Sequence, residues 1–339
     1  MGQSEGAAVR AVLSSWPSAS RPFTPIQWVT GFELLFGCPI TALAQFEGSR
    51  IGSTKWTCDK YGHRLTATQV PGDHWRERHD AVNWALGRFA TACQVPMTIE
   101  VYNLLCQHIS QPGRLHFSGM HSRSHRQGKI PDGVFHLAQD YLYELKTISA
   151  ASSRYGHASG DSAVDKRANK INAEYMKTAH EIDVRWNATI AGQRGPFETA
   201  LRQYGDGGDH CIQGLCVGMF GGISSGITSL LRILAQHGAE RLIQRMGSSS
   251  MKHCQATLLW LARRDLGAVL WTANADLILH RIQHLGGAAT RERSRQRHAQ
   301  HRFFPAGDPA AATWAHRNAA AGFDGHADAR RWRTPFCAA

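Results

Sequence analysis

Three charged residues have types and spacings that suit the hydrolysis of a phosphodiester. Glu144 and Lys146 lie two apart in residues 141–148, a stretch rich in Tyr, Leu, Ile and Thr. The two-residue period of a β-strand puts both side chains on one face. Asp132 directly precedes another short apolar segment, 133–137, and the short, mostly polar connection between the two segments favours a turn. We therefore predict a β-hairpin in which Asp132 lies beside Glu144.

The chemistry of such a hairpin follows from its charges. Two carboxylates that lie close together repel each other unless a cation shares them, and hard oxygen ligands suit Mg²⁺ or Mn²⁺. We expect Asp132 and Glu144 to hold that metal. Lys146 would orient or help deprotonate the attacking water and would neutralise charge developing on the phosphate. The alternative is an ordinary hairpin with a glutamate and a lysine on its surface.

The same residues show a resemblance to a nuclease family. Pro131-Asp132 and Glu144-Leu145-Lys146 resemble the two halves of the PD-(D/E)xK motif of nucleases with the restriction-endonuclease-like fold. The resemblance implies an α/β core in the order helix, three-strand meander, helix, strand.

Apolar periodicity around the hairpin agrees with this order. Apolar residues in 82–93 recur at steps of four, three and four, which predicts a helix with one buried face. Residues 97–105 predict a strand and contain Glu100, a further candidate catalytic carboxylate or, alternatively, a surface glutamate. After the hairpin, an apolar stripe with helical spacing runs through 164–186, and the apolar run 211–220 predicts a buried strand.

A second resemblance covers residues 58–150. This segment resembles the restriction-like endonuclease domain of site-specific non-LTR retrotransposons and of related mobile-element proteins of algae and protists. That resemblance implies a DNA endonuclease of mobile-element origin. The residues that match follow the order of the family, and they are Gly62-His63, Arg78-His79-Asp80, Glu100 and Pro131-Asp132.

The chain departs from this family at the zinc knuckle. A tetrahedral zinc site needs four nitrogen or sulfur ligands, and only Cys58 and His63 fall in place, with Thr68 where the last cysteine would follow. We expect no zinc, and we expect residues 57–73 to form a loop held by packing.

The charge of the chain predicts an acidic partner. Lysine and arginine number 38 and aspartate and glutamate 26, which gives a formal charge of +12. Nucleic acid is the natural partner, and charge alone does not choose DNA over RNA. Candidate contacts to nucleic acid come from a basic loop at 113–128, from the residue that follows it, and from the long helix after the hairpin. They are Arg114, Arg123, Arg126, Lys129, Lys166, Arg167 and Lys170.

Cysteine usage and hydropathy predict the compartment. The eight cysteines form no CxxC pair, which favours reduced thiols in an intracellular protein over a disulfide scaffold. For a DNA endonuclease we expect a nuclear location. No apolar run is long enough to predict a membrane span, and no motif indicates a small-molecule cofactor.

These observations predict four segments. Residues 1–57 form short helices, 58–222 the nuclease core, 223–288 a helical extension, and 289–339 a basic, disordered tail that is a nucleic-acid arm or a solvated helix end. The predicted function is that of a Mg²⁺-dependent DNA endonuclease. The alternatives are an inactive nucleic-acid-binding relic of the same fold and an RNA-processing nuclease.

Overall fold

A computed structural model of the chain describes residues 23–72, 74–99, 105–118, 131–149, 160–204, 211–219 and 221–285, except the side chains of 115–118 and 160–162. The chain divides into two compact units, Met1–Gly286 and Gly287–Ala339, and every described residue belongs to the first. The predicted basic tail therefore lies outside the described part of the chain.

One mixed sheet of four strands lies at the centre of the first unit. Its strands are β1 (Met97–Ile99), β2 (Gly133–Phe135), β3 (Tyr141–Thr147) and β4 (Gln213–Val217), in that spatial order. β1 pairs with β2 and β2 with β3 antiparallel, whereas β3 and β4 are parallel. Helices before β1 and between β3 and β4 complete an α/β arrangement, which confirms the α/β part of the predicted fold class.

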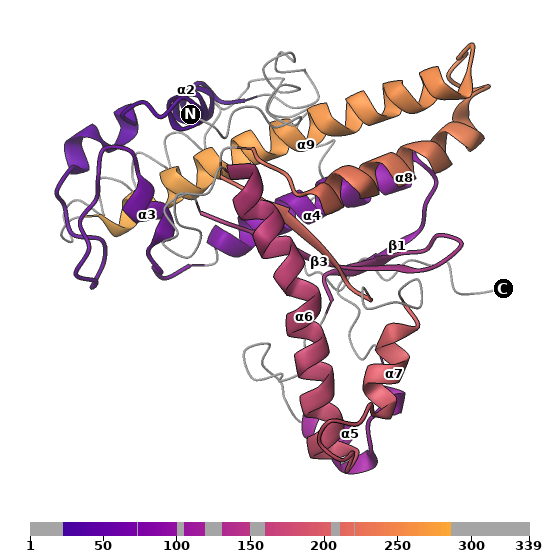
Figure 1. Ribbon diagram of the computed structural model, residues 1–339. Helices are drawn as coiled ribbons and strands as arrows, with labels where there is room; N and C mark the ends of the chain where they lie inside the picture. The colour runs from indigo at the N-terminus through magenta and orange to yellow at the C-terminus, as the bar shows by residue number, and fades with distance from the viewer. Residues whose placement is uncertain are drawn as a thin grey trace. The chain divides into compact units, whose positions relative to one another are not determined.

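Helices cover both faces of this sheet (Figure 1). Those that matter most for the site are α4 (His74–Ala92), α6 (Gly160–Trp186), α8 (Ser225–Leu242) and α9 (Met251–Arg281). One core joins one face of the sheet to α4, α8 and α9, and another joins the opposite face to α6. The sheet is thus buried between α6 and a layer of three helices.

The alternation of β3 assigns its side chains to these two cores. Tyr143 and Leu145 point into the core shared with α4, α8 and α9, whereas Leu142 packs in the core formed with α6. The intervening Glu144 and Lys146 therefore face the α6 side, as the two-residue period requires. The hairpin prediction is confirmed for the relative orientation of these two residues.

The hairpin register brings Asp132 opposite Glu144. Gly133 pairs with Tyr143, so the position before Gly133 faces the position after Tyr143. A Cβ atom at Gly133 would lie 2.5 Å from Oη of Tyr143 and 2.7 Å from the carbonyl oxygen of Thr98. Only glycine permits the close approach of β1, β2 and β3 at this point.

The apolar stripes predicted for the two long helices are buried. In α4, Val82, Leu86 and Phe89 pack in the core shared with α8 and α9. In α6 the buried stripe matches the predicted spacing as far as position 182, and its members are Val164, Ala168, Ile171, Tyr175, Ala179 and Ile182.

Two segments predicted as loops contain helices. α3 (His63–Ala67) forms within 57–73 because the Asp59 carboxylate accepts hydrogen bonds from the backbone N–H groups of Tyr61, His63 and Arg64. These bonds satisfy donors that a helix start leaves open. α5 (Gln111–Ser118) extends into 113–128, where the Ser110 carbonyl accepts from the backbone N–H of Arg114.

The remaining elements connect and flank this core. They are α2 (Pro25–Leu35), η1 (Thr41–Phe46), η2 (Cys106–His108), α7 (Pro196–Arg202) and η5 (Ile282–His284). The segment before α4 shares a core with the last turns of α9, in which Leu34, Ile40 and Leu43 pack with Leu277 and Ile278.

The described cysteines are free thiols, as predicted. Within the described ranges, no helix is both long and apolar enough to cross a membrane.

Candidate active site

The start of β2 holds the Asp132 carboxylate against β3. Its Oδ2 atom accepts a hydrogen bond of 2.7 Å from the backbone N–H of Leu145, which lies between Glu144 and Lys146. The same oxygen lies 3.1 Å from Nε2 of His79. Asp132 is thereby fixed next to both residues of the Glu-x-Lys pair, as the sequence predicts.

Glu144 is a buried carboxylate with two side-chain partners. Its Oε2 atom accepts a hydrogen bond of 2.5 Å from the hydroxyl of Tyr175 on α6, and its Oε1 atom contacts Nζ of Lys146. Burial and the negative charge of Asp132 raise the pKa of Glu144, while Lys146 and the Tyr175 hydrogen bond oppose this rise. The ionised form therefore depends on nearby positive charge.

Lys146 is more exposed to solvent than the two carboxylates. Its side chain is 36% exposed, compared with 8% for Glu144 and 18% for Asp132. A phosphate could approach from the exposed side of Lys146, with the carboxylates behind it.

His79 adds a second cation on the other side of Asp132. Its Nδ1 atom lies 3.0 Å from Oδ1 of Asp80, and its Nε2 atom contacts Asp132. Burial alone would lower the pKa of His79, but the hydrogen bonds to Asp132 and Asp80 outweigh burial and raise that pKa to about 9. His79 is therefore an imidazolium at neutral pH.

An inner layer of side chains supports the site from α4. The Asn83 amide lies between β2 and β3, since its Nδ2 donates to the carbonyl of Asp132 at 3.5 Å and its Oδ1 accepts from the hydroxyl of Tyr143 at 2.6 Å. Five residues earlier, the buried guanidinium of Arg78 donates to the carbonyl of Ile148 just after β3. Both residues fix α4 against the hairpin.

The donor set fits a hard divalent cation. Asp132 and Glu144 offer carboxylate oxygens on adjacent strands, and a cation between them would relieve the repulsion that raises the pKa of Glu144. No described residue donates a hydrogen bond to Oδ1 of Asp132. The partner of Glu144 Oε1 is the end of a flexible lysine, which can rotate toward solvent and expose that oxygen.

Among the described residues, the other predicted site residues lie apart from the carboxylates or were predicted only as nucleic-acid contacts. Glu100, Arg123, Arg126 and Lys129 lie outside the described residues. Arg114 is exposed on α5, which lies near the C-terminal end of α6 because Gly113 packs against Trp186 (Figure 1). With a rise of 1.5 Å per residue, that end is about 16 Å along α6 from Tyr175.

Two of the three basic residues of α6 predicted as contacts lie on its exposed face. Lys166 and Lys170 are exposed, while the neighbouring Ala168 and Ile171 form the buried face that carries Tyr175. Arg167 forms a two-point ion pair with Glu174, at 2.7 and 3.1 Å. Lys166 and Lys170 therefore point away from the carboxylates, whereas Arg167 lies close enough to Cys216, the β4 partner of Lys146, for its charge to act there.

Sequence reasoning missed two contributors. Periodicity places Tyr175 in the apolar stripe of α6 but does not show that its hydroxyl reaches Glu144. The motif Arg78-His79-Asp80 does not by itself give His79 a role, although a histidine directly beside an aspartate is the signal that marks it.

Comparison with protein-family models, with curated proteins and with solved structures finds no match to this chain.

Proposed function

We propose that the protein is a Mg²⁺-dependent endonuclease that hydrolyses phosphodiester bonds of DNA. The observation that carries this proposal is the convergence of Asp132, Glu144 and Lys146 at one end of the hairpin, with the amine half exposed and the carboxylates behind it. The proposal includes a restriction-endonuclease-like fold for the sheet and its flanking helices. The order α4, β1, β2, β3, α6, β4 supports that assignment.

Each residue has a distinct part in the proposed reaction. A bound Mg²⁺ or Mn²⁺ would supply positive charge that polarises the scissile phosphate. The Lys146 ammonium would hold the attacking water or donate a hydrogen bond to a phosphate oxygen as charge develops there. The water oxygen bonds to phosphorus as one P–O ester bond breaks, and solvent takes the proton lost by water and protonates the leaving oxygen.

Tyr175 and His79 act as positioning residues in this proposal. The Tyr175 hydroxyl fixes Oε2 of Glu144, which leaves the other oxygen directed toward Lys146. The His79 imidazolium fixes Oδ2 of Asp132. Oε2 of Glu144 and Oδ2 of Asp132 are thus held by neighbouring side chains, and pre-organised ligands of this kind need little rearrangement to receive a cation.

DNA as the substrate, a mobile-element origin and a nuclear location are further parts of the proposal. The formal charge of +12 and the resemblance of residues 58–150 to retrotransposon endonuclease domains support them.

Nicking of supercoiled plasmid DNA tests the proposed activity. Lys146→Ala should lower the nicking rate by about 100-fold or more, since it removes charge stabilisation from the transition state. Lys177→Ala is the matched control, because it removes an equal charge from an exposed position on α6 that is not a predicted nucleic-acid contact. Equal rates for Lys146→Ala and the wild-type protein would exclude the proposed role.

One observation favours the alternative of an inactive nucleic-acid-binding protein. Both oxygens of Glu144 already have donors within the protein, and the side chain is 8% exposed, which also suits a purely structural glutamate. Under this alternative, the wild-type protein binds DNA but does not nick it with Mg²⁺ or Mn²⁺. Parallel assays on single-stranded and duplex RNA test for an RNA-processing nuclease.

A further inference from the structure

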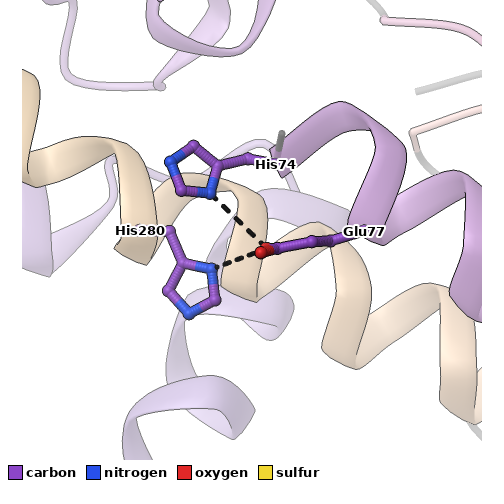
Figure 2. A group of neighbouring side chains, drawn as sticks. All are labelled: His74, Glu77 and His280. Carbon is purple, nitrogen blue, oxygen red and sulfur yellow. Dashed lines mark hydrogen bonds and ion pairs between the residues drawn. The ribbon is translucent and has the colours of Figure 1, made fainter. Parts of the chain in front are cut away.

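A cluster of metal-ligand side chains lies where the start of α4 meets the end of α9. His74 and Glu77 occupy the first turn of α4, and His280 lies in the last turn of α9 (Figure 2). Oε2 of Glu77 lies 3.5 Å from Nδ1 of His74 and 3.3 Å from Nδ1 of His280. The three side chains converge on one point from two helices that are about 200 residues apart in sequence.

These distances match the spacing of ligands around a tetrahedral metal ion. Zinc binds nitrogen and carboxylate oxygen at about 2.1 Å, which places any two tetrahedral ligand atoms about 3.4 Å apart. The ligand atoms of the three residues all lie within 4.8 Å of one another, so small side-chain rotations would close the set around one ion. Two imidazoles and one carboxylate suit a borderline transition metal better than Mg²⁺.

We propose that His74, Glu77 and His280 bind one divalent transition-metal ion of the zinc type. The three side chains would leave one tetrahedral position for water. This ligand set shares no residue with Cys58 and His63, where the sequence departs from a zinc knuckle. The proposal is also independent of the catalytic hairpin.

Neighbouring residues provide the support that a metal site needs. Nε2 of His74 lies 3.4 Å from the Gln283 side-chain amide, and rotation of that amide by 180° would present its oxygen to the N–H of a histidine that binds metal through Nδ1. Glu77 is 58% exposed, so an ion can enter from solvent. The positive charge of Arg281, next to His280, would weaken binding but not block the site.

Arg281 also shows what the ion would do. Its guanidinium donates to the carbonyl groups of Leu65, Thr66 and Thr68, and it stacks on Trp75 at 4.6 Å. This buried contact already joins the end of α9 to α3 and α4. A metal ion at the adjacent cluster would add a second cross-link at the same junction and would fix the helix that carries His79.

Calorimetric titration of the metal-free full chain with ZnCl₂ tests the proposal. We expect one equivalent of zinc to bind and the melting temperature to rise with zinc concentration. Glu77→Gln and His280→Gln should each weaken binding by about 100-fold, and Gln283→Ala by about 10- to 100-fold. X-ray absorption should show nitrogen and oxygen ligands at about 2.0–2.1 Å without sulfur.

Two controls identify the site. His253→Gln changes an exposed histidine outside the cluster and should retain binding. Asp132→Asn should also retain binding, which separates this site from zinc held by the catalytic carboxylates. Because Glu77 is exposed, its variant tests the ligand set even if His280→Gln fails to fold. Absence of binding by the wild-type protein, or unchanged binding in Glu77→Gln, would overturn the proposal.

Discussion

The charge of the Asp132 carboxylate and of its neighbour Glu144 must be balanced by nearby cations. Asp132 and Glu144 place two negative groups in a partly buried space, and two cations, Lys146 and the His79 imidazolium, flank them. The site is close to neutral without a bound ion. A divalent cation would therefore compete with Lys146 for Glu144, so metal binding and release of the lysine are linked.

The raised pKa of Glu144 gives a prediction about stability and pH. Because the folded protein holds the proton more tightly than the unfolded chain does, Glu144 destabilises the metal-free protein as pH rises above the usual glutamate pKa. We therefore measure the melting temperature of Glu144→Gln minus that of the wild type in EDTA. This difference should become more positive as the pH rises from about 4.5 to about 8. Glu181→Gln, an exposed change on α6, should show no such trend.

Melting of the wild type and of Glu144→Gln with added Mg²⁺ complements the measurement in EDTA. Added Mg²⁺ should raise the melting temperature of the wild type and not that of Glu144→Gln, because the ion stabilises only a protein that binds it. If the melting temperature of the wild type instead rises relative to that of Glu144→Gln with increasing pH in EDTA, the ionised glutamate is stabilising and the prediction is wrong.

At the scale of secondary-structure elements, the periodicity of apolar residues predicted which side chains share a face of a strand or helix. The alternation in β3 placed Glu144 and Lys146 on one face, and the stripe of α6 identified its buried side. The short helix α3 escaped prediction because its capping by Asp59 and its contact with Arg281 depend on side-chain geometry and on a residue more than 200 positions away. The periodicity of apolar residues shows neither side-chain hydrogen bonds nor contacts between residues far apart in the chain.

The close packing of the hairpin makes Gly133 a sensitive position of β2. Gly133→Ala would drive a methyl group into the Tyr143 hydroxyl and the Thr98 carbonyl, and the resulting shift should cost about 1–3 kcal/mol of unfolding free energy. Gly218→Ala is the control, because its new Cβ would approach nothing closer than 3.4 Å. Denaturant unfolding measures both.

The same variant tests the dependence of the site on the hairpin. A displaced β2 moves Asp132 away from the N–H of Leu145, so nicking by Gly133→Ala should fall even where the protein remains folded. Unchanged stability and activity would mean that the strands separate easily at this point and that the register does not hold the carboxylates in place.

For the molecule as a whole, the sequence predicted the α/β class but not how its parts share their cores. α8 and α9, expected as an extension, pack directly on α4 and the sheet, and the end of α9 packs with the N-terminal segment. These contacts join residues far apart in the chain, and amphipathic helices do not specify their partners by sequence spacing. The predicted nucleic-acid contacts remain dispersed among the described residues, with Arg114 near one end of α6 and Lys166 toward the other.

Dispersed charge predicts a particular form of DNA binding. With a formal charge of +12, attraction to the phosphate backbone should dominate affinity, so the logarithm of the binding constant should fall linearly with the logarithm of salt concentration. If six or more phosphates are contacted, affinity should fall about 1000-fold or more between roughly 50 and 200 mM salt. Fluorescence anisotropy with labelled duplex DNA measures this slope.

Variants then separate binding from catalysis. Lys146→Ala should change the slope by about 1 at most, since it removes a single phosphate contact, and the full chain should still bind. A combined Lys166→Ala and Lys170→Ala variant should lower the slope further if α6 lies along the backbone. Affinity that does not depend on salt, or no binding at low salt, would contradict a nucleic-acid role and with it the nuclease proposal.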